Sequence, residues 1–109
     1  MTTFIAEELS LDQAAAVQPV LARIARVDRH LADQLRRSVQ SVALNLAEGS
    51  GRTGGDRTHC FRIALGSHRE VRTALRLAVC HGYVGAAQLE TAERIHDRLS
   101  RMLWSLAKM

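Results

Sequence analysis

The chain has 109 residues, of which 47% are hydrophobic, so it has enough apolar material for one domain with a single core. Its formal net charge is +4 and fourteen of its fifteen basic residues are arginine, a composition that favours anionic partners. No apolar stretch approaches the roughly 20 residues of a membrane span, and the N-terminus lacks the basic-then-apolar order of a signal peptide, so we expect a cytoplasmic protein with no membrane partner.

Helical periodicity predicts an all-α fold with four helices, over about residues 10–27, 30–48, 56–81 and 86–108. The first helix is expected to begin at a capping box from Ser10 to Gln13 and to reach Val27, with Pro19 kinking or restarting it. The second ends at a glycine-rich break and carries an apolar stripe at three-to-four-residue spacing, formed by Leu31, Leu35, Val39, Val42 and Leu46.

The third helix has a good N-cap residue in Asp56, and Gly82 is expected to end it. The fourth helix directs an apolar stripe inward, made of Ala92, Ile95, Leu99, Met102, Leu103 and Leu106. Because short connections join consecutive long helices, we predict an up-down-up-down four-helix bundle in which residues 1–109 form a single domain.

Several apolar residues lie off these core stripes. The third helix has one apolar face of Phe61, Leu65, Leu75 and Val79, and another of Ile63, Ala74 and Leu77. Leu44 and Trp104 also lie away from the stripes of their helices. Since the bundle covers only one face of a helix, this second set indicates a subunit interface and therefore a homo-oligomer.

Charge is concentrated in the middle of the chain, where residues 21–76 hold eleven arginines against five acidic residues. Five of these arginines lie on one sector of the third helix or at the edge of the second: Arg62, Arg69, Arg72, Arg76 and Arg36. They form either a solvated face with weak ion pairs to acids such as Glu93 or Asp97, or a ridge that binds nucleic-acid phosphates. Repetition around an oligomer favours the ridge, with Arg52 and Arg57 as further mobile phosphate contacts.

A second group of polar residues crowds the apolar stripes of the middle helices: Arg37, Asn45, Glu48, Ser67 and Glu70. We expect a structural network in which Arg37 pairs with Glu70 or Glu48, while Asn45 and Ser67 close hydrogen bonds between the two helices. Gly66 is expected to let the helices approach each other where Ser67 meets its partner.

Other motifs carry little chemistry. Residues 49–54 read GSGRTG and match a dinucleotide-binding pattern, but they follow a helix instead of a strand. Cys60 and Cys80 would lie roughly 30 Å apart on one continuous helix, which excludes a disulfide between them, and their neighbouring histidines point elsewhere on the helix. We therefore expect no metal site. The chain also has no recognisable pair of nucleophile and base, so we expect no cofactor and no enzymatic activity.

The segment LRRSVQSVALNLAEGSGR followed by IALGSHRE resembles the four-helix-bundle proteins encoded in intervening sequences of bacterial large-subunit ribosomal RNA genes. The resemblance is specific over about residues 30–84, whereas the residues before and after this segment match only in their helical pattern. A related branch is the accessory variability protein of diversity-generating retroelements. The resemblance implies a small homo-oligomer, five-fold in known relatives, without established enzymatic chemistry. The tighter turn expected between the first two helices departs from the family pattern and leaves the first boundary and the oligomer geometry open.

Three functional hypotheses remain open at this point. The first is an oligomeric nucleic-acid-binding protein, for RNA or DNA, whose arginines contact phosphates without reading sequence. The second is an interaction scaffold that docks another protein, such as a reverse transcriptase, as the retroelement branch implies. The third is a purely structural oligomer or an unrecognised enzyme. The basic helices offer no aromatic platform, which argues against recognition of single strands by base stacking.

Overall fold

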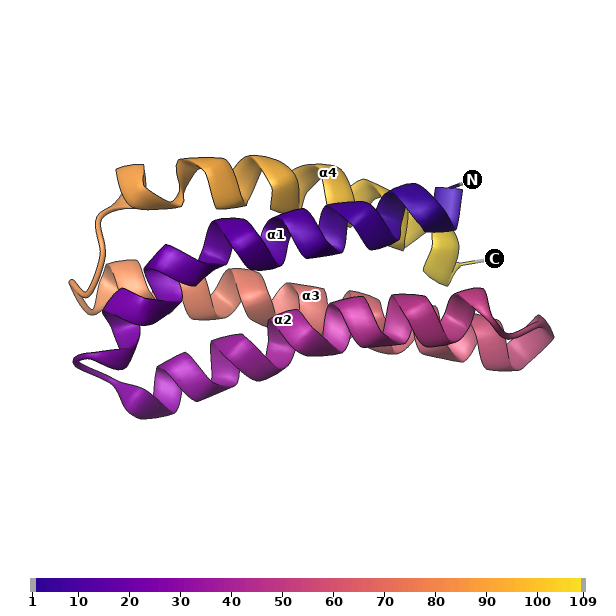
Figure 1. The fold of residues 1–109 in the computed structure, drawn as a ribbon, viewed down its shortest axis with the longest axis horizontal. Coiled ribbons are helices and arrows are strands. Elements are labelled where there is room, and N and C mark those ends of the chain that lie inside the picture. Colours follow the sequence, from indigo (N-terminus) through magenta and orange to yellow (C-terminus); the bar gives the residue numbers. More distant parts are fainter. Residues whose placement is uncertain (1, 109) are drawn as a thin grey trace.

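Four α-helices and one short 3-10 helix form the part of the chain that the computed structural model describes, residues 2–108 (Figure 1). Their bounds are α1 Thr2–Ala25, α2 Arg29–Ser50, α3 Gly54–Cys80, η1 Ala86–Leu89 and α4 Glu90–Ala107. The connections alternate between the two ends of the molecule, and the two chain ends lie at the same end (Figure 1). The all-α prediction with four packed helices is confirmed.

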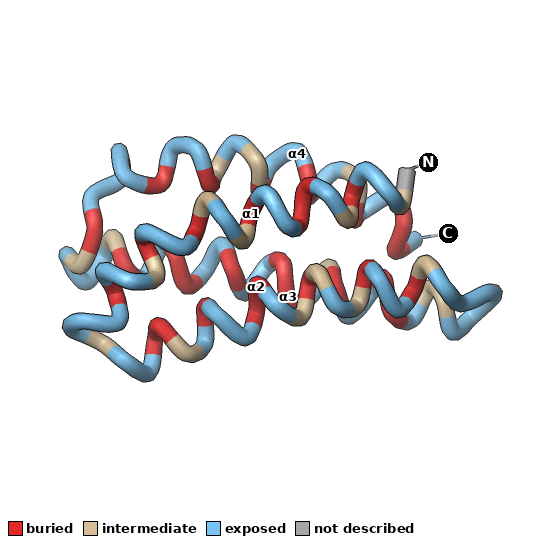
Figure 2. Tube along the Cα trace, viewed as in Figure 1, coloured by how far each residue is buried: buried red, intermediate tan, exposed pale blue. Residues whose placement is uncertain are grey.

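The core lies along the axis between the four helices, where each contributes its buried face (Figure 2). The predicted stripe of α2 is confirmed, since all five of its residues are buried. In α4 the predicted stripe is buried except for Ile95 and Met102, which are partly buried and pack against the same core. Alanine is common at buried positions, and Phe61 is the only Phe, Tyr or Trp side chain that is fully buried among the described residues.

The predicted start of the first helix is wrong, because α1 begins at Thr2 and not at Ser10. Ser10 lies inside the helix, where its Oγ donates to the carbonyl of Glu7 at 2.6 Å. Ala6 and Leu9 are buried in the core, and this tertiary burial extends the helix beyond what local capping signals indicate. Pro19 lies within α1 at an exposed position, and its missing N–H leaves the carbonyl of Ala15, also an exposed residue, without its helical hydrogen bond.

The two loops at the end opposite the termini are tied together through Asp28. Its side chain caps α2 by accepting a hydrogen bond from the Leu31 amide at 2.9 Å. It also accepts one from the Tyr83 hydroxyl at 2.9 Å, in the connection after α3. These two bonds lower the pKa of Asp28. The adjacent Gly82 has a φ of +76°, a left-handed conformation that ends α3 where the sequence predicts it.

Two helix starts differ from the predicted ones. α3 starts at Gly54 with Thr53 in the N-cap position, ahead of the predicted Asp56, which lies instead in the first turn. There its negative charge faces the positive end of the helix dipole. The last helix opens as the 3-10 turn η1 before α4 begins at Glu90.

Helices α2 and α3 approach each other closely at Gly49. A Cβ atom at this position would lie 2.6 Å from Phe61 Cε1 and 2.9 Å from Phe61 Cδ1. The absence of a side chain at Gly49 is therefore what lets the largest buried ring pack under the α2–α3 turn.

Candidate functional site

The arginines of α3 follow a spacing that places them on one outer sector of the helix. Arg62, Arg69, Arg72 and Arg76 are all exposed, and at about 100° per residue they lie within a sector of roughly 80°. From the first to the last the row is about 21 Å long, at 1.5 Å of rise per residue. This row is called the arginine face below.

Ion pairs engage three of the predicted phosphate-binding residues. Arg36 pairs with Asp33 at 2.9 Å, Arg52 with Glu48 at 3.2 Å, and Arg72 on the arginine face with Asp97 of α4 at 3.5 Å. All six side chains are between 43% and 55% exposed. Exposed pairs of this kind contribute about 0–1 kcal/mol each, so they hold their arginines only weakly.

Two further predicted residues serve the fold. Arg62 donates from Nε to the carbonyl of Ala107 at 3.2 Å, next to the negative end of the α4 dipole. Arg57 donates to the carbonyl of Gly49 at 3.3 Å, and its guanidinium lies 4.9 Å from the centre of the Phe61 ring. Arg57 therefore packs against the α2–α3 turn, and its role as a phosphate contact stays a prediction.

The guanidinium groups of the remaining two, Arg69 and Arg76, have no ion-pair or hydrogen-bond partner anywhere in residues 2–108. Both are exposed on the arginine face, one on either side of Arg72 along the helix. They are the residues of this face that a solvated anion can reach without displacing a bond within the protein.

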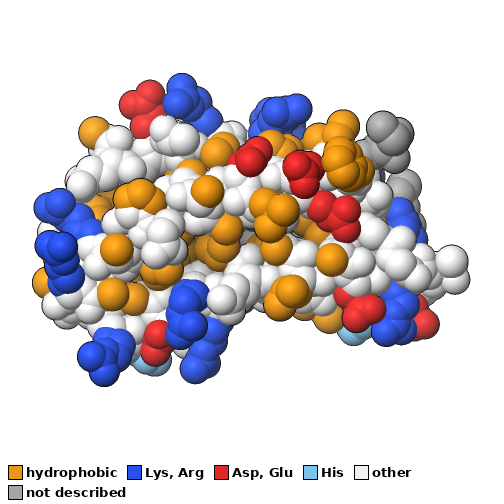
Figure 3. Space-filling view, in the orientation of Figure 1, with side chains coloured by type: hydrophobic (Ala, Val, Ile, Leu, Met, Phe, Trp, Pro, Cys, Tyr) orange, Lys and Arg blue, Asp and Glu red, His pale blue; other side chains and the backbone are white. Residues whose placement is uncertain are grey.

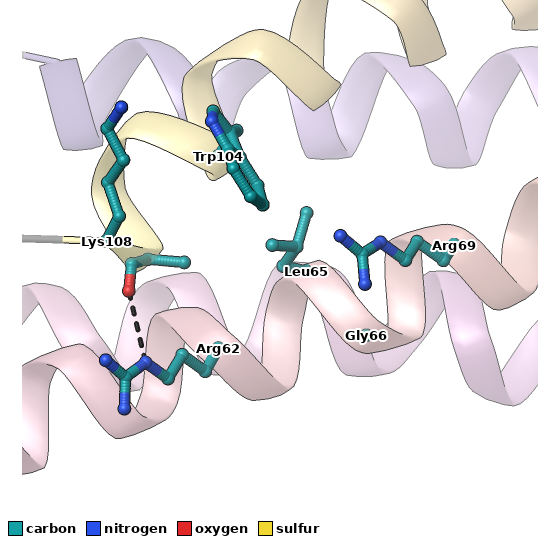
Figure 4. Close-up of a pocket in the computed structure, with 7 residues that line it drawn as sticks. Arg62, Leu65, Gly66, Arg69, Trp104 and Lys108 are labelled. Carbon is teal, nitrogen blue, oxygen red and sulfur yellow. Dashed lines mark hydrogen bonds between the residues drawn. The ribbon is translucent and has the colours of Figure 1, made fainter.

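A groove of about 350 Å³ runs between the arginine face and the C-terminal end of α4, and is called the α3–α4 groove below (Figure 4). Its lining brings together cationic, aromatic and small residues: Arg62, Leu65, Gly66, Arg69, Trp104, Ala107 and Lys108. The Trp104 side chain, 53% exposed, projects from α4 toward Leu65, and the Arg69 guanidinium lies beyond Leu65 on the α3 wall (Figure 4).

Gly66 on the α3 wall has a different role from the one its sequence context predicts. It is exposed, and a Cβ atom there would meet nothing within 4 Å. Close packing of helices within the chain therefore does not require glycine, although glycine in a helix interior costs about 0.5–1 kcal/mol relative to alanine. The missing side chain leaves the wall of the groove open.

The predicted polar network is smaller than expected. Ser41 Oγ and Ser67 Oγ lie 2.7 Å apart and join α2 to α3, and Asn45 donates to the Ser41 carbonyl and hydroxyl. Asn45 thus reaches Ser67 through Ser41 and not directly. The predicted pairing of Arg37 with Glu70 or Glu48 is wrong, because Arg37 and Glu70 are exposed and form no ion pair within the described chain, and Glu48 pairs with Arg52.

A second polar cluster is buried between α3 and α4. The rings of His68 and His96 stack with their centroids 3.6 Å apart and their planes 9° apart. His68 Nε2 lies 3.0 Å from the His96 carbonyl, and His96 Nε2 lies 2.8 Å from the His68 carbonyl, so each neutral ring donates to the backbone of the other. Gln13 of α1 faces His68 Nδ1 at 3.5 Å.

This histidine pair is held neutral by its surroundings. Burial, reinforced by the neighbouring His96, lowers the pKa of His68 to about 4, and burial also lowers the pKa of His96. Arg72, Asp97 and Glu93 are the charged groups nearby, while α1 contributes only the neutral Gln13 amide. Both imidazole nitrogens that donate are bonded to backbone carbonyls, and the only cavity that His96 lines among the described residues has a volume of about 10 Å³, so we assign the pair to the core.

Charge differs along the face that α1 and α2 form (Figure 3). Acidic side chains gather over the N-terminal half of α1, where Glu7, Glu8 and Asp12 lie, and most of the basic ones lie toward the opposite end, although some also lie at the end where α1 begins (Figure 3). Exposed Leu11 and Leu44, at 56% and 68%, add apolar surface to these two helices. This face is mixed in charge, unlike the arginine face.

Within residues 2–108, no three histidine, cysteine or acidic side chains come together in a way that could hold a metal ion. Both cysteines are free. None of the described helices is long and apolar enough to cross a membrane.

Sequence reasoning placed Trp104 off its core stripe, and the structure agrees, but that reasoning did not pair Trp104 with the arginine face. The two lie on different helices, 28 or more positions apart in the chain. The register of α4 against α3 decides whether they meet, and no local pattern carries that register. Lys108 was missed for the same reason.

The chain was compared with known proteins. A family model described as 23S rRNA-intervening sequence protein matches residues 7–105. A solved structure of a protein with unknown function from the S23 ribosomal protein family of Bacteroides thetaiotaomicron VPI-5482 is similar over the whole of both chains, with a TM-score of 0.88. Its sequence identity is 20%, so this likeness shows the fold alone. No curated protein matches the chain. The family match covers nearly all of the sequence, and the chain therefore belongs to the 23S rRNA-intervening sequence protein family.

Proposed function

We propose that this protein is a non-enzymatic, homo-oligomeric nucleic-acid-binding protein whose arginine face contacts backbone phosphates without reading sequence. In this proposal each subunit is an up-down-up-down bundle, and several subunits, five in the favoured arrangement, form a ring that repeats the face. Neutralising phosphates releases counterions, so binding by such a surface weakens steeply as salt is raised.

The observation that carries the proposal is the exposure of Arg69 and Arg76 without partners, on either side of a weakly paired Arg72. A solvated helix face commonly alternates arginine with acidic residues, whereas within residues 2–108 the only acidic partner of this face is Asp97. The guanidinium fork also matches phosphate oxygens better than an ammonium does.

The oligomeric part of the proposal is supported by apolar exposure. Large apolar side chains are exposed on all four α-helices, among them Leu11, Leu44, Ile63, Leu77 and Trp104. A groove of about 420 Å³ between α2 and α3 is lined in part by the core residues Leu31 and Ala74 and by the exposed Leu77, and Leu77 adds to the apolar surface that a neighbouring subunit would bury.

The experiment that tests the proposal is fluorescence anisotropy with labelled duplex DNA and structured RNA at about 50 mM and 200 mM salt. The double variant Arg69→Gln/Arg76→Gln is expected to bind at least tenfold more weakly at the lower salt, because it loses two charge-assisted phosphate contacts per subunit.

The matched control is Arg98→Gln/Arg101→Gln, which removes the same charge from exposed positions of α4 that line none of the grooves described. It is expected to bind nearly as tightly as the wild-type protein. Equal losses in the two variants would mean that net charge alone governs binding. Absence of binding by the wild-type protein at low salt would refute the proposal.

A second candidate is a protein-interaction scaffold, with a reverse transcriptase as the kind of partner that the resemblance implies. The α2–α3 groove favours it, since Glu70, Thr73 and Leu77 there offer mixed polar and apolar contacts. Co-purification of the enzyme with wild-type protein, and its loss with Leu77→Glu at unchanged subunit number, would support this candidate.

A further inference from the structure

We propose that the α3–α4 groove binds an unpaired nucleotide of single-stranded nucleic acid, with its base stacked on Trp104 and its phosphates held by Arg69 and Lys108. This inference rests on the proposed function and deepens it by naming the form of nucleic acid that the groove selects. It reverses the expectation from sequence that the basic helices lack an aromatic platform.

The chemistry of the lining points to a ligand that is both flat and anionic. Trp104 is the only tryptophan of the chain, and its side chain is 53% exposed at the mouth of the groove. Three cationic residues surround it, namely Arg62, Arg69 and Lys108, and the described residues that line this groove include no acidic side chain. A purely apolar partner would leave these charges without counterions, whereas a duplex would keep its bases away from the indole.

The positions of the three cations divide their roles. Arg62 is oriented by its Nε bond to the Ala107 carbonyl, which leaves its two terminal nitrogens without a partner in the described chain. Arg69 points into the groove from the α3 wall, beyond Leu65 (Figure 4). Lys108 stands at the opposite end, on the α4 side (Figure 4). Phosphates on either side of a stacked base would thus meet a cation at each end.

Gly66 supplies an independent observation. It lines the groove, its missing side chain has open space around it, and nothing within the chain requires glycine there. Glycine in such a place is typical of close approach between backbone and ligand. The volume of about 350 Å³ also falls within the range of about 300–1,000 Å³ that small-ligand sites span.

The test uses the intact oligomer with three labelled 12-mers, namely oligothymidylate, oligouridylate and an abasic strand with the same backbone charge. Since Trp104 is the sole tryptophan, quenching of its fluorescence reports stacking directly. We expect both base-bearing strands to quench it and the abasic strand to bind without quenching. Trp104→Leu is expected to weaken binding of the base-bearing strands about tenfold, leaving the abasic strand unaffected, and Trp104→Phe is expected to restore most of the affinity.

Two further variants separate loss of base stacking from loss of folding. Gly66→Leu keeps the tryptophan but fills the groove, and is expected to abolish quenching while salt-dependent binding of the abasic strand persists. Leu44→Ala removes another exposed apolar side chain, on α2, and is expected to change neither readout.

Equal binding of all three strands, without quenching, would overturn this inference and leave phosphate binding by the arginine face intact. Failure of every strand to bind at low salt would overturn this inference alone if duplex DNA still binds, and would overturn the proposed function as well if duplex DNA and structured RNA fail too. A change of subunit number in Trp104→Leu would also overturn it, because it would assign the groove to a subunit interface.

Discussion

Acidification is expected to destabilise the fold through the buried histidine pair. Burial and the neighbouring His96 hold the pKa of His68 at about 4, below its ordinary value of 6.5. The unfolded chain therefore binds a proton more readily than the folded one between these two values. The neutral pair contributes its full stability above pH 6.5, and that contribution is lost as the pH falls toward 4.

The size of the loss follows from the shift. The difference between 4 and 6.5 corresponds to about 3 kcal/mol when complete, of which about 2 kcal/mol is already lost at pH 5. His96 adds to the loss in the same direction, because burial lowers its pKa too. A domain of this size has a total stability on the order of 5–15 kcal/mol, so the effect is easily measured.

The assay is urea unfolding followed by circular dichroism at pH 7.5, 6 and 5, at one protein concentration because the subunits are proposed to associate. His68→Gln/His96→Gln is expected to flatten the pH dependence, whatever its stability at pH 7.5. His59→Gln changes an exposed histidine of the same helix and should leave the dependence intact. A wild-type free energy of unfolding that is unchanged from pH 7.5 to 5, or a slope that survives in the double variant, would refute the reasoning.

Three further predictions concern stability and accessibility. Gly49→Ala is expected to lower the free energy of unfolding by about 1–3 kcal/mol, because its Cβ would overlap the buried Phe61 ring. Gly66→Ala is expected to raise the free energy of unfolding by about 0.5–1 kcal/mol, because alanine favours a helix interior over glycine. Equal effects of the two substitutions in urea unfolding would contradict this. Asp28→Ala is expected to lower the melting temperature more than Asp28→Asn, since asparagine can still cap α2, and calorimetry would show it. A thiol reagent should label exposed Cys80 quickly and buried Cys60 only on unfolding, and prompt labelling of both would contradict the burial described.

The helical elements follow largely from local patterns, and α2 shows why. Its apolar stripe, its polar opposite face and its glycine-rich end all indicate the same helix. The observed bounds lie within two residues of the predicted ones. The start of α1 does not follow from local patterns, because Ser10 and Gln13 resemble a capping box although both are buried within the helix. Only contacts with the other helices show that residues 2–9 belong to it.

The candidate site depends more on tertiary register. The arginine spacing on α3 predicts a common sector, and Arg72 pairs with Asp97 as one of the two interpretations expected. Which arginines stay unpaired depends on where α4 places its acids and its carbonyl groups, as the Arg62 bond to Ala107 illustrates. Gly66 shows the same limit, since sequence cannot tell a glycine that packs closely from one that leaves a wall open.

The most direct test of phosphate binding is the salt dependence of duplex DNA binding by the wild-type oligomer. Each phosphate that the protein neutralises contributes about −0.9 to the slope of log K against log salt. With Arg69 and Arg76 free on every subunit that touches the duplex, we predict a slope steeper than about −2 and little difference among sequences. A slope near zero, or no measurable binding at low salt, would contradict the account.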